Sequence, residues 1–554
     1  MSFNKLALKP RLLSIFYLIA LIANMMVASC TNSYAQTLKL GKVKFLNSGS
    51  EQAQEAFLDG LAALHCFWYQ KAFDKFKEAE RIDPTFALAY WGESMTYNHP
   101  IWYQQDLDGG RSALKQLGNT QEERIAKGKT EIEKALIGSL DLLYGDGTKE
   151  ERDQKYKGEL ERLFKKFPDN IEVASFYALS ILGTTRVSEG NFKKQLQAAN
   201  LVEGFLKKRE SDVLQHPGLL HYLIHAYDHP RYANKAIKFA NLYSKVSADS
   251  SHALHMPSHI FLQLGIWDKV VDQNIDSYGA SVKWAKLDQK GNEAHDFHSL
   301  YWLLYGYLQQ GRLNDAKSVL ATMKSIAVAD SSDRVQGYYG MLKVRYAIES
   351  NQWEELSIPK NPTETKERFE ANLHAGCVGS ESEHNRISTI LGLGIGATKT
   401  GNLKAAEEAI EHIKHLKASY SNDNGEFDQK ILDIQYQMIS GLLEITRGSN
   451  TKGIGALKKA AEAEEHLDPP SGPPIPAKPA TELYAEALLD QNQVSEALKW
   501  FKKSLVRTPD RTLSLLGAYR ASKKLKLNSA SKQYLNSLKR NLIKADPSVK
   551  NHIS

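Results

Sequence analysis

The sequence is poor in cysteine, and this limits the kinds of site that it can build. Its 554 residues include three cysteines, Cys30, Cys66 and Cys377. Cys30 falls at the end of an N-terminal leader, and the other two are far apart, without the spacing of a metal-binding pair. A disulfide framework and a cysteine-based zinc site are therefore both excluded.

A strong charge of one sign is also missing. The formal net charge is +7, and acidic residues are interspersed among the basic ones. Loss of the leader would remove Lys5, Lys9 and Arg11, which lowers the charge by three to +4. No basic stripe interleaved with aromatic residues stands out, so the sequence predicts no nucleic-acid partner.

Familiar catalytic and nucleotide-binding signatures are absent as well. The sequence contains no Gly-x-Ser-x-Gly elbow, no P-loop and no His-Glu-x-x-His. Strand-like alternation is nearly absent, and no segment after the leader is long and apolar enough to span a membrane. The sequence favours a non-enzymatic helical protein; if it is an enzyme, a metal-dependent hydrolase is the expected class.

Residues 1–29 have the pattern of a bacterial secretory signal, a basic segment followed by an apolar run over Leu12–Ala28. The four residues ending at Cys30, Val-Ala-Ser-Cys, resemble a lipobox, whose cysteine becomes the lipidated N-terminus. Cleavage after Ala35 is the alternative. We expect an exported cell-envelope lipoprotein facing the periplasm, anchored to the membrane through Cys30, or otherwise a periplasmic or secreted protein. Residues 30–52 would be a linker.

A repeated spacing organises the rest of the chain. In residues 53–86, Ala72 is followed by Phe76 and then by Pro84, and residues 478–511 repeat alanine, phenylalanine and proline at the same spacing. This spacing resembles the tetratricopeptide-repeat (TPR) consensus, in which small residues let two helices approach and proline ends the second. The predicted fold is all-α, a TPR-type α-solenoid formed as a right-handed superhelix of antiparallel helix pairs.

The repeats and their interruptions predict a domain organisation. We expect N-terminal TPR pairs over 53–145, a central histidine-rich TPR array over 150–350, an irregular connection over 351–385, and a C-terminal TPR array over 386–545 with a proline-rich segment at 468–479.

Histidines recur in register with the repeat. His221 and His225 are four residues apart, as are His255 and His259, and the two pairs are one 34-residue repeat apart. With repeats framed at 217 and 251, each pair occupies positions 5 and 9 of a first helix. Residues four apart lie on one helical face, so each pair is predicted to point one way.

The resemblance to TPR proteins extends the set, because positions 2, 5, 9, 12 and 13 of their first helices line the concave groove. It implies that further side chains line that groove, namely Asp228 at position 12, His252 and His298 at position 2, and His65 and His99 at position 13.

Two histidine pairs on neighbouring helices are what a first-row transition metal, such as zinc, requires from imidazole ligands. The candidate ligands are His221, His225, Asp228, His255 and His259, and Asp228 could instead orient a ligand. Two observations oppose a metal site. Groove histidines can act as half-buried hydrogen bonders that stabilise stacked helices, and the proline after Met256 places His255 at a helix start, where it would share a face with His259 less well.

Longer motifs resemble one family of large exported bacterial TPR proteins. They are HPG at 216–218, HYLIHAYD at 221–228 and HMPSHIF at 255–261. This family has no settled function, so the resemblance implies a fold more than a role. The favoured function is an envelope binding or scaffold protein that captures a protein, peptide or glycan in the groove. A metal carrier or metal-dependent hydrolase is the alternative, and a SusD-type glycan-binding lipoprotein of a polysaccharide-utilisation system is a minor one.

Overall fold

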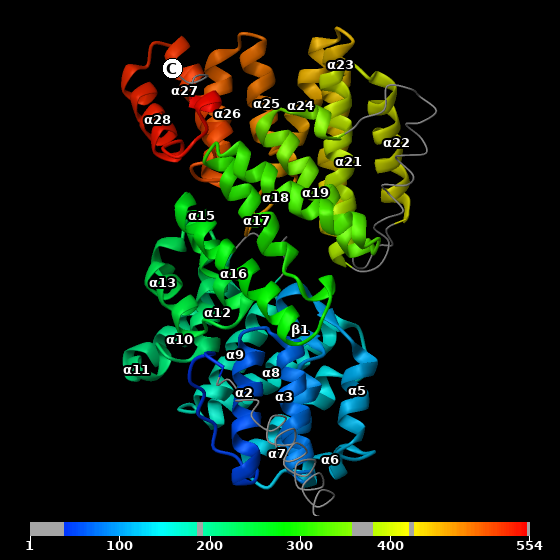
Figure 1. Cartoon of the computed structure of the whole chain (residues 1–554), viewed down its shortest axis with the longest axis vertical. Coiled ribbons are helices and arrows are strands. Elements are labelled where there is room, and N and C mark those ends of the chain that lie inside the picture. The colour runs from blue at the N-terminus through cyan, green and yellow to red at the C-terminus, as the bar shows by residue number, and fades with distance from the viewer. Residues whose placement is uncertain (1–37, 186–191, 357–379, 420–425, 551–554) are drawn as a thin grey trace, which may run out of the picture. The chain divides into compact units, whose positions relative to one another are not determined.

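A computed structural model describes residues 38–185, 192–356, 380–419 and 426–550, and these residues are mostly helical (Figure 1). The signal segment, Cys30 and Cys377 lie outside the described residues. From Leu40 onward the chain forms one compact unit. Within the described ranges, no helix is both long and apolar enough to cross a membrane.

The first half of the chain carries these elements: η1 (Glu51–Ala53), α2 (Gln54–His65), α3 (Tyr69–Ile82), α4 (Ala87–Met95), β1 (Asn98–His99), η2 (Pro100–Trp102), β2 (Gln104–Gln105), α5 (Leu107–Lys115), α6 (Gln121–Lys127), α7 (Glu131–Leu143), α8 (Lys149–Lys166), α9 (Ile171–Gly183), α10 (Lys193–Lys208), α11 (Glu210–Val213), α12 (Pro217–Tyr227), η3 (Ala233–Ala236), α13 (Ile237–Val246), α14 (Ser251–His255), α15 (Pro257–Gln263) and α16 (Trp267–Leu287). The short strands β1 and β2 pair in antiparallel fashion.

The second half continues with η4 (Asn292–Ala294), α17 (Phe297–Gln309), α18 (Leu313–Ala329), α19 (Asp333–Ser350), η5 (Trp353–Leu356), α21 (Ser380–Thr400), α22 (Leu403–Ser419), α23 (Glu426–Thr446), α24 (Asn450–Glu465), α25 (Ala480–Asp490), α26 (Val494–Arg507), α27 (Thr512–Lys524), α28 (Asn528–Asn541) and α29 (Pro547–Lys550). Helix α21 begins inside the segment 351–385, which the sequence had suggested is irregular.

Small residues allow the helices of each repeat to approach. In the repeat framed at 53, Ala72 and Phe76 of α3 are fully buried, and α3 packs against both α2 and α4. A Cβ atom on Gly92 in α4 would lie 2.4 Å from a ring carbon of Phe76, so only glycine fits there. The same arrangement recurs near the C-terminus, where Gly517 faces Phe501. Helices of this kind follow one another along the chain, and the predicted class, an all-α TPR-type α-solenoid, is confirmed.

Polar residues fix where many helices begin. Thr120, Thr130 and Thr148 each form a reciprocal capping box with a glutamate three residues later. In the histidine-rich region, Ser250 caps α14 and Asp296 caps α17. These caps fix where α14 and α17 begin, the two helices that carry His252, His255 and His298.

The proline-rich segment at 468–479 is not helical, as its composition predicts. Its backbone carbonyls accept hydrogen bonds from distant helices. Gln263 of α15 donates to the Pro470 carbonyl at 2.8 Å, and the buried Arg345 of α19 donates to the Pro474 carbonyl at 2.8 Å. The segment therefore packs against the middle of the chain.

Candidate metal centre

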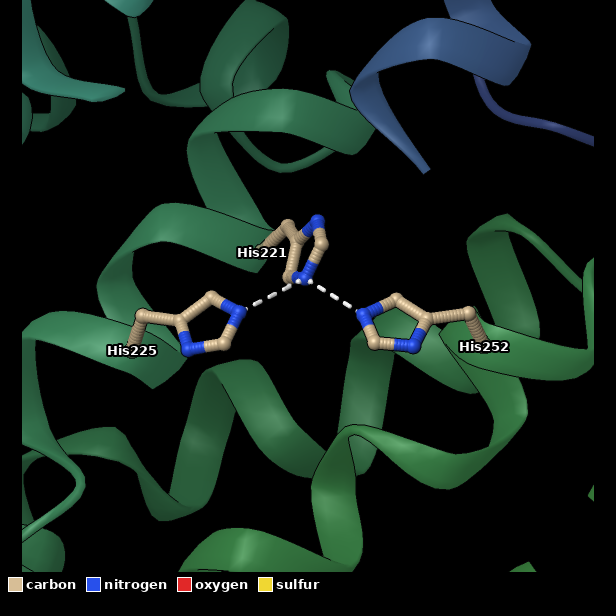
Figure 2. Close-up of side chains that lie close together, drawn as sticks. All are labelled: His221, His225 and His252. Atoms are coloured by element: carbon tan, nitrogen blue, oxygen red, sulfur yellow. Dashed lines mark hydrogen bonds between the residues drawn. The ribbon is translucent and has the colours of Figure 1, made fainter. Parts of the chain in front are cut away.

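Three histidines converge at a point between α12 and α14, and we call His221, His225 and His252 the first triad. The Nε2 atom of His221 lies 3.1 Å from Nε2 of His225 and 3.2 Å from Nε2 of His252. Figure 2 shows both neighbouring rings turned toward this one nitrogen of His221. His221 is fully buried, whereas the other two are partly exposed.

The backbone fixes the tautomer of His221. Its Nδ1 lies 2.8 Å from the carbonyl oxygen of His65, and a carbonyl can only accept a hydrogen bond. Nδ1 must therefore carry the proton, and the Nε2 of a neutral His221 presents a lone pair to the two neighbouring rings.

Three more histidines form a second triad, His255, His259 and His298, contributed by α14, α15 and α17. One ligand nitrogen from each lies within 4.8 Å of the other two. The Nε2 atoms of His255 and His259 are 3.1 Å apart. Pro257 does not separate them, because Met256 keeps helical angles (φ −53°, ψ −38°) and His255 ends α14 instead of starting a new helix.

The hydrogen bonds of the second triad leave two lone pairs facing each other. Nδ1 of His255 donates to Oδ1 of Asn274 at 2.7 Å, and the amide nitrogen of Asn274 is used by the Val270 carbonyl, which fixes the orientation of that side chain. Nδ1 of His259 donates to Oδ2 of Asp228 at 2.6 Å. Both Nε2 atoms are then unprotonated in the neutral rings, and at 3.1 Å they repel unless a cation lies between them.

Three of the separations between ring nitrogens are close to those around a metal ion. A tetrahedral ion with metal–nitrogen bonds of about 2.0–2.1 Å places its ligand nitrogens roughly 3.3 Å apart. The separations between Nε2 atoms are 3.1 and 3.2 Å in the first triad and 3.1 Å in the second. The remaining pairs of ligand nitrogens in each triad lie within 4.8 Å of each other, so each triad brings three nitrogens close enough to be drawn around one ion.

Burial keeps these rings in the form that binds metal. Removal from water lowers the pKa of His221, His225, His252 and His255 well below the usual histidine value, and neighbouring histidines lower it further. A neutral imidazole has the lone pair that a metal needs, so no proton has to be displaced from these rings at neutral pH.

Aromatic rings pack against members of both triads. Phe67 packs on His221 with ring centroids 4.3 Å apart, and Trp302 packs on His259 at 4.5 Å. Trp102 lies 5.5 Å from His252 and is 43% exposed, so the apolar surround reaches the surface beside the first triad.

A third cluster, His65, Glu172 and His216, contrasts with the triads because its donors and acceptors are matched. Glu172 accepts from Nε2 of His65 at 2.8 Å and from Nε2 of His216 at 2.9 Å. The remaining ring nitrogens accept from the Tyr222 hydroxyl and the Leu219 amide. All three residues are buried and need no cation to satisfy them. His65, expected to line the groove, is instead buried in this network and holds His221 through its carbonyl.

The remaining sequence candidates lie around the triads. His99 stacks on Tyr69 with ring centroids 3.8 Å apart, and its Nε2 lies 3.1 Å from the Thr96 carbonyl, so it belongs to neither triad. Asp228 accepts from His259 and, at 3.0 Å, from Gln263. It has the geometry of a residue that orients a ligand.

The repeat frame predicts His252 and His298 in the groove, and neither is among the predicted ligands. The structure adds each to a pair from the preceding repeat. Positions 5 and 9 of one repeat meet position 2 of the next repeat. This occurs between the repeats that start at 217 and 251, and again between those that start at 251 and 297. The recurrence of histidine at positions 2, 5 and 9 is the sequence signal that identifies both triads.

No protein-family model matches the chain, and no curated protein matches it. Solved structures of similar fold include the human IFIT1 dimer with m7Gppp-AAAA (13% identity, 92% of each chain covered, TM-score 0.35). Others are Cut9–Hcn1 of the APC/C (13% identity, 81% of this chain and 78% of that one, TM-score 0.37) and yeast Tom70 (12% identity, 86% and 90%, TM-score 0.29). At these TM-scores the similarities assign no function to this chain.

Proposed function

We propose that the protein is a TPR-type metal-binding protein whose two triads each hold one transition-metal ion. One observation carries this proposal. The Nε2 atoms of His255 and His259 face each other at 3.1 Å while both Nδ1 atoms donate elsewhere. An ion between them replaces a repulsion with two bonds.

The ligand chemistry selects the metal class. The triads offer neutral imidazole nitrogens without thiolate or carboxylate, which suits zinc or copper and disfavours magnesium and calcium, ions that prefer oxygen. Three protein ligands leave the fourth position of a tetrahedral ion open. Closed four-ligand sites are structural, so an open position favours a carrier that passes its ion on, or a hydrolase that activates water.

A competing arrangement places a proton instead of an ion between the rings. His259 would be an imidazolium paired with Asp228, and it would donate from Nε2 to His255. Elemental analysis of the purified protein distinguishes the two. We expect about one equivalent of zinc or copper per triad, hence about two per chain.

Matched variants locate the metal. The double variant His255→Ala, His259→Ala should lose about half of the metal, and His221→Ala, His225→Ala the other half. The exposed His466, outside both triads, provides the control His466→Ala, which should retain all of it. A parent protein without metal, even after incubation with zinc or copper and removal of excess, would refute the proposal and favour the proton.

If the parent protein does bind metal, His225→Ala separates an enzyme from a carrier. An enzyme should lose turnover, whereas a carrier should only hold its metal less tightly.

A second candidate is a metal-independent scaffold that binds a protein, peptide or glycan, and it rests on the half-exposed Trp102 beside His252. Aromatic residues of this kind anchor interfaces. Capture of the same partner by the parent and by the His221→Ala, His225→Ala variant would support it, whereas capture that requires metal would return the role to the triads.

We also propose export to the bacterial envelope with lipid attached at Cys30, supported by the signal pattern of residues 1–29 and by the lipobox-like sequence that ends at Cys30. Fatty-acid labelling of cells tests this, since Cys30→Ser should abolish the label. Label that persists in the variant, or its absence from the parent, would overturn lipidation.

A further inference from the structure

We propose that the two triads form one dinuclear centre, in which a small anion, hydroxide in water, bridges the two ions. This inference rests on the proposed metal binding and deepens it, because it says how the ions are arranged and what completes their coordination.

The triads are adjacent. Rings of different triads approach closely, with centroids 6.0 Å apart for His225 and His259 and 6.2 Å apart for His252 and His255. Rings within a triad are about 1 Å closer, at 4.8 Å for His221 and His225 and 5.0 Å for His255 and His259. The six rings therefore form one continuous cluster.

The backbone ties the two triads together. Helix α14 contributes His252 to the first triad and His255 to the second, three residues later on the same helix. Helix α12 contributes His225 to the first triad, and Asp228 at its C-cap accepts from His259 of the second. Movement of either helix would therefore disturb both triads.

The charge balance calls for an anion. Six neutral imidazoles leave the charge of two divalent ions uncompensated. Asp228, bonded to His259, is one carboxylate beside them. Asp296 is another, since it accepts at 2.8 Å from Ser251, next to His252, and at 2.8 Å from Ser299, next to His298. Two carboxylates against two divalent ions leave a net positive charge in a largely buried site, and an anion that contacts both ions reduces it most.

The coordination number leads to the same arrangement. Each triad supplies three nitrogens, and a four-coordinate ion needs one more ligand. A single oxygen can serve both ions at once, as in sites where paired metals lie about 3.5–4 Å apart. Hydroxide is the smallest such ligand, and azide is its convenient probe.

Copper loading tests the inference, because two bridged Cu²⁺ ions couple magnetically and lose electron paramagnetic resonance (EPR) intensity. The full-length protein is loaded with copper, bound copper is measured by elemental analysis, and EPR-visible copper is measured on the same sample. We expect about two bound ions per chain and EPR-visible copper at least about two-fold below bound copper. Azide should alter the spectrum and the visible absorption of both ions together.

Variants with one triad provide the reference. His221→Ala, His225→Ala and, separately, His298→Ala should each bind about one ion whose EPR intensity equals the bound copper. The single substitution keeps the test usable if the double variant unfolds, which circular dichroism would show.

Two results would overturn the inference in different ways. Two bound ions with full EPR intensity, equal to the sum of the one-triad variants, would remove the bridge and leave metal binding intact. No bound copper in the parent would remove the proposed function itself, and this inference with it.

Discussion

Replacement of Asp228 by asparagine should weaken metal binding at the second triad alone. In the structure the carboxylate accepts from Nδ1 of His259 at 2.6 Å and from Gln263 at 3.0 Å. Asparagine keeps one acceptor and turns the other into a donor. If its oxygen faces His259, its NH2 opposes the Gln263 amide. If it flips, the NH2 opposes Nδ1 of His259 and drives the proton to Nε2, where the metal should bind.

The size of the effect follows from the bonds lost. A hydrogen bond to a charged group contributes about 1.5–3 kcal/mol and one between neutral groups about 1 kcal/mol. The substitution therefore raises the free energy of the metal-bound state, relative to the metal-free state, by about 1–2 kcal/mol. This corresponds to roughly a 5- to 30-fold rise in Kd.

The assay is a competition titration with a coloured zinc chelator, run in the His221→Ala, His225→Ala background so that only the second triad binds. Asp490→Asn, an exposed aspartate at the end of α25, is the control and should leave Kd unchanged. An Asp228→Asn protein with the parental Kd would refute the orienting role. A weaker Kd accompanied by a much lower melting temperature would assign Asp228 to stability instead.

Three further outcomes follow from other parts of the chain. Cys30→Ser should move the protein from the membrane to the soluble fraction of cell extracts, as immunoblots of the fractions would show. Gly92→Ala should lower the free energy of unfolding by about 1–3 kcal/mol in urea titrations, because its Cβ would contact Phe76 at 2.4 Å. Burial, with Glu93 nearby, raises the pKa of Glu80 to about 8. A carboxyl group with a raised pKa stabilises the fold at low pH, and this contribution is lost as pH rises through about 8. The free energy of unfolding should therefore decline by about 1–2 kcal/mol between roughly pH 5 and 8, and Glu80→Gln should make this decline smaller.

The sequence predicted the helices well because each repeat carries its own signals. The alanine, phenylalanine and proline spacing located α2 with α3 and α25 with α26, since small residues at helix crossings and a terminating proline act locally. The network of His65, Glu172 and His216 could not be predicted in this way. Glu172 lies on α9, more than a hundred residues from His65, and nothing in the repeat spacing indicates that the two side chains meet.

The sequence predicted the second triad only in part. His255 and His259 were candidates, but the proline after Met256 suggested that their faces would differ. A proline at the first position of a helix removes an amide that has no intrahelical acceptor there, so it need not bend the chain. Met256 keeps helical angles and the two rings still meet. The third member, His298, required knowledge of how the next repeat packs.

His298 lies in the second triad although the chain segment before its repeat is longer than in the first triad. The repeat framed at 297 starts 46 residues after the one at 251, whereas the repeat at 251 starts 34 residues after the one at 217. The additional residues are taken up by the long helix α16, Trp267–Leu287, and by the connection containing η4, before Asp296 caps α17. Position 2 of the new helix still meets positions 5 and 9 of the previous one. The same three repeat positions therefore meet in both triads although the two repeat intervals differ in length, so the convergence depends on how neighbouring helices pack and not on the number of residues between them.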